Sequence, residues 1–223
     1  MHPFRLFLSA LCAGFAIGLG GAAYVAQTNK VLGAVLFCVG LFTICECNFH
    51  LFTGKVCYAR ERSWKDYWEY GVIWCGNFAG TGLVAFLIQQ TRLFDGSTAA
   101  ALALIQTKNS DTLLSLFILG IFCNIFVFLA VEGYKHFPLE LGKYLAIFFG
   151  VIVFILSGYE HCIADMFYYF MAGAMDGNAL LRILIITCGN ICGGLLAYSG
   201  VRLVRASKQH TVCNNTTGCE EPK

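Results

Sequence analysis

Two apolar segments of this chain end before they are long enough to cross a lipid bilayer. Val31–Cys45 has 15 residues and Tyr144–Ser157 has 14. At 1.5 Å per residue, either helix would cover roughly 20 Å of a hydrocarbon core about 30 Å thick. Each segment runs into a polar stretch, Glu46–Lys55 or Gly158–Asp165, before a short apolar run resumes. Irregular backbone at that depth is tolerated only where it is buried in protein or lines a cavity.

The composition of the whole chain is that of a membrane protein. Hydrophobic residues make up 58% and charged residues 13% of the sequence, whereas soluble domains carry about 25% charged residues. We therefore expect an all-α polytopic membrane protein with six transmembrane helices, of which the second and fifth are broken. The first apolar run lacks a cleavage site, so we interpret it as a span and not as a signal peptide. The expected spans are Phe4–Ala26, Val31–Tyr58, Tyr67–Gln89, Thr112–Tyr134, Tyr144–Ala174 and Ala179–Val204.

The lysines and arginines near the span ends predict the orientation. Six crossings place both ends of the chain on one side, and that side carries eleven lysines and arginines against four on the other. The excess of positive charge predicts that both termini are cytoplasmic. We expect a single channel domain over residues 1–206 and a disordered cytoplasmic tail over residues 207–223. The net charge of +2, without a basic stretch, argues against nucleic acid as a partner.

The chain also contains an internal repeat. CGNFAGTGLVAF (Cys75–Phe86) recurs as CGNICGGLLAY (Cys188–Tyr198), at a spacing of 113 residues. The repeats would cover about residues 4–89 and 112–204. With three crossings in each half, the two halves must be inverted relative to each other. Interrupted helices at matching positions of inverted halves indicate a transport site near the bilayer midplane.

The residues of the two polar stretches suggest the chemistry of that site. Half-helices that begin near Thr53 and Asp165 would present free N–H groups, which favour a small anion, and Thr53 is a candidate N-cap. His161 could change its charge near neutral pH, and Glu160 beside it could orient or charge it. The alternative is a neutral structural histidine bonded to a nearby carbonyl. In the first stretch, Glu46 and His50 could form a bracing pair.

Three buried amides and several glycines are predicted to have scaffold roles. Asn77 and Asn190 follow glycine in the repeated motif, and Asn124 lies within the fourth span. Buried amides need hydrogen-bond partners, and we expect those partners to be loose backbone groups of the two polar stretches. Small residues permit close packing of membrane helices. We expect this role for Gly14, Gly18, Gly20, Gly21, Gly80, Gly82, Gly193 and Gly194.

These features together resemble the formate/nitrite transporter family. The resemblance rests on LFTG (Leu51–Gly54), CNIFVFLAV (Cys123–Val131), SGYEHCIADMF (Ser157–Phe167) and the paired G-N-x-x-G motifs. It implies an aquaporin-like protomer with one pore, assembled as a homopentamer. It also implies a channel or proton-linked transporter for monovalent weak-acid anions such as formate, nitrite, hydrosulfide, acetate or lactate. The partners would be these anions, protons and the lipid bilayer, without a cofactor.

The resemblance assigns roles to individual positions. Thr53 and His161 match the central threonine and histidine, and Lys108 matches a lysine that draws anions into the outer vestibule. The remaining matches are Leu51 and Phe154 at an outward apolar constriction, Phe37, Leu41 and Val127 at an inward one, and Asn124 and Asn190 around the centre.

Three charged positions depart from the family pattern. His50 stands where relatives have an acidic residue, Asp165 stands where they have asparagine, and Lys55 replaces a more usual neutral residue. These departures bring charge close to the expected pathway. Asp165, four residues after His161, would then raise the pKa of the histidine and hold its charged form.

Two other functions fit parts of the sequence. An aquaporin-like channel for a neutral solute, ammonia or water, is the alternative transport function, although paired N-P-A motifs are missing. An intramembrane metal or redox enzyme could use Cys45, Cys47 and His50, but C-x-C-x-x-H alone is a weak pattern. We therefore predict a transport protein and not an enzyme, in a prokaryotic inner or plasma membrane.

Overall fold

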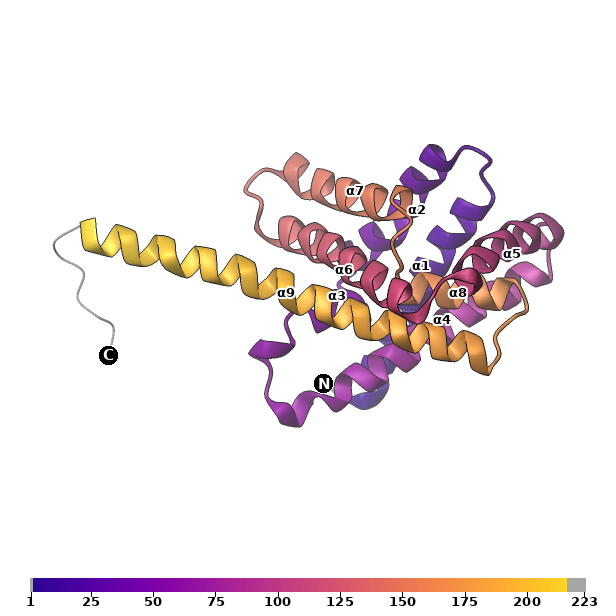
Figure 1. Ribbon diagram of the computed structural model, residues 1–223, viewed down its shortest axis with the longest axis horizontal. Coiled ribbons are helices and arrows are strands. Elements are labelled where there is room, and N and C mark those ends of the chain that lie inside the picture. The colour runs from indigo at the N-terminus through magenta and orange to yellow at the C-terminus, as the bar shows by residue number, and fades with distance from the viewer. Residues whose placement is uncertain (1, 216–223) are drawn as a thin grey trace.

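The computed structural model describes residues 2–215, with side chains through residue 205. These residues form an all-helical protein (Figure 1). The α-helices are α1 (Pro3–Val25), α2 (Lys30–Glu46), α3 (Phe52–Val56), α4 (Trp68–Gln89), α5 (Phe94–Ser110), α6 (Leu113–His136), α7 (Glu140–Leu156), α8 (Cys162–Met171) and α9 (Gly177–Asn215), and the 3₁₀ helices are Ala59–Glu61 and Trp64–Asp66.

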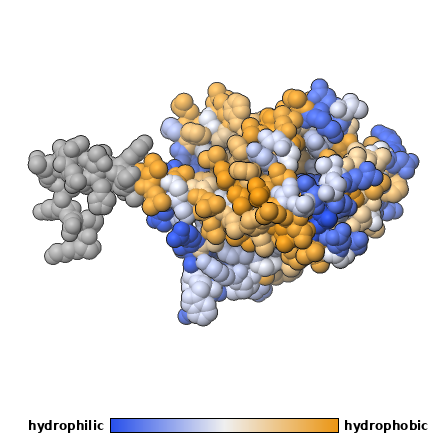
Figure 2. Space-filling view, in the orientation of Figure 1, coloured by the Kyte–Doolittle hydropathy of each residue, from blue (hydrophilic) through white to orange (hydrophobic). Residues whose placement is uncertain are grey.

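Most of these helices belong to six crossings. The helices α1, α4, α6 and α9 are each long and apolar enough to span a bilayer. The helices α2 and α7 have 17 residues each and stop early, and each is followed by a short helix, α3 or α8. This arrangement confirms the predicted breaks in the second and fifth spans. Hydrophobic side chains cover much of the face in Figure 2, as expected for a surface in contact with lipid.

The helix contacts follow the internal repeat. In the first half α1 packs against α2 and α4, and in the second half α6 packs against α7 and α9. The two halves meet where α2 packs against α7. Each short helix also contacts the last long helix of the opposite half, α3 against α9 and α8 against α4. The halves are thus interlocked, and both breaks are enclosed by protein.

Glycine allows the long helices of each half to approach one another. A Cβ atom on Gly80 of α4 would lie 2.2 Å from the carbonyl oxygen of Leu11 in α1. A Cβ atom on Gly193 of α9 would lie 2.1 Å from the carbonyl oxygen of Ile121 in α6. Both distances are far below van der Waals contact, so only glycine fits. These contacts confirm the packing role predicted for the glycine-rich faces.

Two features differ from the sequence-based expectation. Residues 94–110, which lie between two of the expected spans, form α5, which packs against α8. The last helix continues to Asn215, whereas we expected disorder from residue 207 on. No glycine or proline interrupts residues 201–217, so nothing in the local sequence ends the helix earlier. The rest of the expected tail, residues 216–223, lies outside the described residues.

Candidate permeation site

The apolar helices α2 and α7, which stop early, end in the same way. Asn48 follows α2 with φ 55°, and Gly158 follows α7 with φ 71°. A residue in the left-handed conformation commonly ends a helix, and glycine and asparagine adopt it most readily. The backbone then reverses onto the end of the helix, since the N–H groups of Phe49 and Tyr159 donate to the carbonyls of Ile44 and Phe154. The sequence therefore ends both helices deep inside the protein.

Asn77 holds the first break in place from the neighbouring helix α4. Its Oδ1 atom accepts a hydrogen bond of 2.8 Å from the N–H of Phe52, the first residue of α3. Its Nδ2 atom donates to the carbonyls of His50 and Ala10, at 3.0 and 2.7 Å. The expected N-cap, Thr53, instead lies inside α3. The amide of Asn77 takes the capping role, so the hydroxyl of Thr53 is available for another contact.

Asn190 of α9 repeats this arrangement at the second break. Its Oδ1 atom accepts from the N–H of Cys162 at 3.0 Å, and its Nδ2 atom donates to the carbonyls of Glu160 and Gly120. Asn124 adds a link between the halves, because its Nδ2 atom donates to the carbonyls of Thr53 and Asn190. These bonds are the backbone partners predicted for the three amides. The Oδ1 atom of Asn124 is buried without a partner among the described residues.

Thr53 and His161 join the two breaks directly. The Oγ1 atom of Thr53 lies 2.9 Å from Nε2 of His161, and both side chains are buried. The Nδ1 atom of His161 accepts a hydrogen bond of 3.1 Å from the N–H of Ala164, so His161 is the N-cap of α8. A nitrogen that accepts a hydrogen bond carries no proton, which assigns the ring as neutral with its proton on Nε2. His161 therefore donates to Thr53, and the hydroxyl hydrogen of Thr53 is left for another acceptor.

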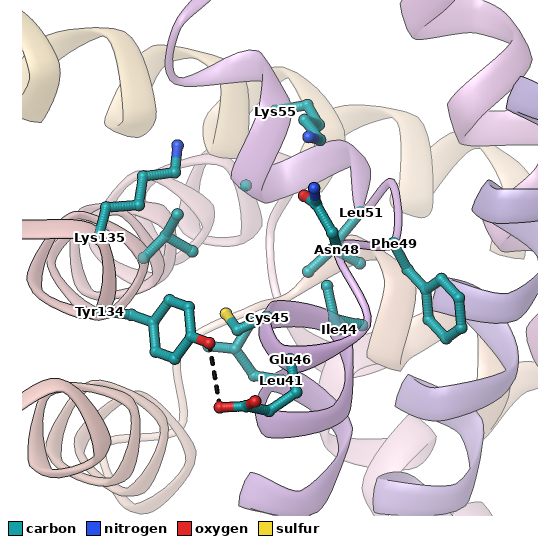
Figure 3. Close-up of a pocket in the computed structure, with 12 residues that line it drawn as sticks. Leu41, Ile44, Cys45, Glu46, Asn48, Phe49, Leu51, Lys55, Tyr134 and Lys135 are labelled. Atoms are coloured by element: carbon teal, nitrogen blue, oxygen red, sulfur yellow. Dashed lines mark hydrogen bonds between the residues drawn. The ribbon is translucent and has the colours of Figure 1, made fainter. Parts of the chain in front are cut away.

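Two cavities approach this pair from opposite ends of the molecule. A cavity of about 160 Å³ is lined by Phe37, Phe154, His161 and Lys108, among others; we call this side the Lys108 end. A cavity of about 370 Å³ is lined by Leu41, Leu51 and Lys55, among others (Figure 3); we call this side the Lys55 end. Apolar side chains thus lie on both sides of the pair of Thr53 and His161.

The aromatic side chains at the Lys108 end stack against the histidine. The rings of Phe154 and His161 are 5.7 Å apart and nearly parallel, at 20°. Phe37 meets Phe154 edge to face, with ring centroids 6.2 Å apart. These contacts hold the imidazole plane and narrow the space beside it.

Lys108 is engaged by two carboxylates. Its ammonium group forms ion pairs with Glu160 and with Asp165, the latter at 2.8 Å, and its side chain is only 11% exposed. The second oxygen of Asp165, Oδ2, is buried without a partner among the described residues. Counted with both carboxyl groups ionised, the lysine and the two acids have a formal charge of −1. The cluster therefore adds no excess positive charge at the Lys108 end.

Comparison with known proteins shows the family. A sequence model described as "Formate/nitrite transporter" matches residues 1–204. The chain belongs to the formate/nitrite transporter family. It is 30% identical to "Formate channel FocA" of Haemophilus influenzae over 190 residues, which cover 74% of this chain and 66% of that protein. It is 31% identical to "Formate-nitrite transporter 2" of Toxoplasma gondii over 228 residues, which cover 86% of this chain and 49% of that protein.

Solved structures of the formate/nitrite transporter family share the fold. A structure described as "Pentameric formate channel with formate bound" superposes with a TM-score of 0.75 at 25% identity, and it covers 94% of this chain and 98% of its own. A second one, "FNT family ion channel", gives a TM-score of 0.80 at 25% identity, with 91% of each chain covered. This chain spans less than two thirds of the length of the two curated relatives named above.

Two of the constriction residues expected from the family resemblance change places. Leu51 was expected at the outward constriction with Phe154, but it lines the cavity at the Lys55 end with Leu41. Phe37 was expected at the inward constriction, but it meets Phe154 at the Lys108 end. The direction of α2 explains the difference, because Phe37 lies one turn nearer than Leu41 to the start of that helix. Val127 is buried in the core.

Four charged or titratable residues of the two polar stretches have other partners than expected. Glu160 and Asp165 bind Lys108 and not His161, so the expectation that they charge the histidine is wrong for this structure. The carboxylate of Glu46 accepts from the hydroxyl of Tyr134 at 3.0 Å. His50 instead contacts the hydroxyl of Ser9, with Nδ1 and Oγ 2.8 Å apart. The predicted bracing pair of Glu46 and His50 is therefore replaced by contacts to α6 and α1.

Proposed function

We propose that this member of the formate/nitrite transporter family is a channel for small monovalent anions of weak acids, with formate among them. The pathway runs from the cavity at the Lys55 end, past Leu51, Thr53 and His161, to the cavity at the Lys108 end. The observation that carries the proposal is the buried hydrogen bond between Thr53 and His161, with a cavity and apolar side chains on either side of it.

The apolar residues on both sides oblige a permeating ion to lose its water. Desolvation of an unpaired charge costs several kcal/mol at least. A weak-acid anion can avoid much of that cost, since it can cross as the neutral acid after it takes a proton from solution. An anion of a strong acid, such as chloride, cannot do so. The apolar constrictions therefore favour weak acids.

The pair of Thr53 and His161 supplies one hydrogen-bond donor of fixed orientation between the two apolar constrictions. The N–H of His161 occupies one lone pair of the Thr53 hydroxyl, so the hydroxyl hydrogen can point to an oxygen of the permeating species. A hydrogen bond to an oxygen of the neutral acid contributes about 0.5–1.5 kcal/mol. Because His161 also caps α8, its ring is fixed in the orientation that this donation requires. In this proposal His161 donates its N–H to Thr53, and the Thr53 hydroxyl in turn donates to the permeating species.

The assembly and orientation are part of the same proposal. One similar solved structure is described as a pentameric channel, and the described surface carries many exposed leucine and phenylalanine side chains. We propose a homopentamer with a pore through each protomer. The lysine and arginine distribution supports cytoplasmic termini, which makes the Lys55 end the cytoplasmic one. The relatives named above come from a bacterium and from Toxoplasma gondii, so a prokaryotic inner or plasma membrane remains a prediction.

A flux panel in proteoliposomes tests the function. Formate, nitrite, hydrosulfide, acetate and chloride are offered separately to vesicles with the purified protein and to protein-free vesicles. We expect protein-dependent flux of formate and of at least one other weak acid, and none of chloride. Water permeability, measured by osmotic shrinkage of the same vesicles, tests the alternative of a channel for a neutral solute. Protein-dependent water flux without flux of any anion would overturn the proposal.

A further inference from the structure

The cavity at the Lys55 end carries positive charge that the proposed function has not used. Lys55 and Lys135 line this cavity of about 370 Å³, and Figure 3 shows both side chains above those of Leu41 and Leu51. The same two lysines line an adjoining, wider cavity of about 790 Å³. That cavity is bordered by five lysines and arginines against two glutamates. Both lysines therefore border the two cavities through which an anion could reach Leu51 from this end.

The carboxylates near these lysines are bound to other groups. Glu132 forms an ion pair with Arg205 at 2.7 Å and accepts from the hydroxyl of Tyr58. Glu61 is bound by the hydroxyl of Tyr198 and by Arg202. Glu46, in the smaller cavity, accepts from Tyr134, as the dashed line in Figure 3 marks. None of these acids neutralises Lys55 or Lys135.

Lys55 and Lys135 themselves form no ion pair with any residue that the structure describes. The ammonium group of Lys135 lies 3.8 Å from the centre of the Tyr58 ring, a contact that holds the charge without cancelling it. Lys55 is half-buried in α3, two residues after Thr53. Its position in the last turn of α3 places a positive charge on the same short helix that carries Thr53.

The opposite mouth carries no excess of positive charge. Lys108 is bound by Glu160 and Asp165. Arg182 donates to the backbone carbonyls of residues 108, 109 and 111. Lys30 lies 5.0 Å from the centre of the Tyr24 ring and does not line the cavity. The lining of the cavity at the Lys108 end thus has a formal charge of −1, whereas the wider cavity at the Lys55 end has a formal charge of +3.

We infer that Lys55 and Lys135 form a binding site for a small monovalent carboxylate or comparable anion, and that the protein concentrates anions at this mouth alone. The inference rests on the proposed function and names the step that precedes the apolar constriction. Positive side chains raise the local anion concentration, and salt screens that attraction. The two mouths should therefore respond differently to salt.

The consequence is a one-sided dependence on ionic strength. A passive pore has the same permeability in both directions, so the direction of flux does not report the asymmetry. The screening length falls from about 30 Å at 0.01 M salt to about 10 Å at 0.1 M. Screening of the attraction between two lysines and the anion should lower the permeability about threefold. Salt should have this effect only when it is added to the solution that bathes Lys55 and Lys135.

Membrane vesicles of known orientation provide the test. Formate influx is measured in right-side-out and inside-out vesicles from cells that produce the full chain, while external potassium gluconate is raised from about 0.01 M to about 0.1 M against sucrose. We expect influx to fall about threefold in vesicles that expose the Lys55 end, and to stay constant or rise in the others. The double variant Lys55→Gln with Lys135→Gln should remove the dependence, and Lys55→Arg with Lys135→Arg should keep it.

Lys65→Gln is the matched control, because Lys65 is exposed at the same end and lines neither cavity. It should leave the salt dependence as in the wild type. Equal salt dependence on both faces, or a dependence that persists in the double glutamine variant, would overturn the inference while formate flux still supports the proposed function. Absence of protein-dependent formate influx in both vesicle types would overturn the proposed function, and this inference with it.

Discussion

Thr53 and His161, 108 residues apart in the sequence, share a buried hydrogen bond of 2.9 Å between Oγ1 and Nε2. Thr53 belongs to the short helix α3 of the first half, and His161 caps the short helix α8 of the second. The bond is therefore the point at which the two interrupted spans meet. Its geometry also assigns the proton of the ring, because Nδ1 already accepts from Ala164.

The capping role of His161 predicts different outcomes for two substitutions. His161→Ala removes the acceptor of the Ala164 N–H and should lower the free energy of unfolding by about 0.5–2 kcal/mol. His161→Asn should fold like the wild type, since asparagine is a good N-cap. Thermal unfolding of the detergent-solubilised protein measures the difference. Equal loss of stability in both variants would show that the loss does not come from the cap.

The matching bonds of Asn77 and Asn190 predict matching penalties. Substitution of either by leucine leaves two buried backbone carbonyls and one buried N–H without the amide. Each unsatisfied group costs about 1–3 kcal/mol, so both variants should be produced poorly or unfold at clearly lower temperature. Gln90→Leu, at an exposed amide after α4, is the control. A stable Asn77→Leu or Asn190→Leu variant would argue against the bracing role.

The close approach of α6 and α9 predicts a position-dependent effect along one helix. Gly193→Ala places a Cβ atom 2.1 Å from the carbonyl oxygen of Ile121, whereas Gly200→Ala meets nothing within 4 Å. Forced overpacking costs about 1–3 kcal/mol. Gly193→Ala should therefore lower the unfolding temperature, and Gly200→Ala should leave it unchanged or raise it. The opposite order would contradict the packing described for the repeat.

The cluster around Lys108 predicts that the lysine matters more to stability than Asp165 does. Lys108→Met leaves two buried carboxylates without their cation, and breaking a buried ion pair in this way costs about 3–5 kcal/mol. Asp165→Asn keeps the pair of Lys108 and Glu160 and should be tolerated. Yield and thermal unfolding of the two variants give the comparison. A Lys108→Met protein as stable as Asp165→Asn would mean that the carboxylates do not depend on the lysine.

Much of this architecture could be predicted from the sequence, because it depends on local patterns. The breaks follow from apolar runs of 15 and 14 residues that meet polar stretches, and the repeated C-G-N motif placed Asn77 and Asn190 in equivalent positions. Both asparagines bind the backbone groups that the breaks leave open. Helix α5 was missed, although its alanine-rich run has high helix propensity, because residues 94–110 show no strong apolar face.

The charged contacts could not be predicted, since they join residues far apart in the chain. Lys108 meets Glu160 and Asp165 across 52 and 57 residues, and proximity of Asp165 to His161 in the sequence suggested the wrong partner. Thr53 looked like an N-cap because the sequence could not show that Asn77 fills that position from another helix. In both cases a residue from a distant segment makes the contact that the sequence assigned to a nearby residue: Lys108 binds Asp165, and Asn77 caps α3.

The most direct test of the proposed pathway is the formate permeability of proteoliposomes that contain Thr53→Val or Thr53→Ser. Valine has nearly the shape of threonine but lacks the hydroxyl, and serine keeps it. If the permeating acid accepts a hydrogen bond from Thr53, worth about 0.5–1.5 kcal/mol, Thr53→Val should lower permeability by about twofold to tenfold. Thr53→Ser should stay close to the wild type, and thermal unfolding confirms that both variants are folded. A folded Thr53→Val protein that passes formate at the wild-type rate would contradict a pathway past Thr53 and His161.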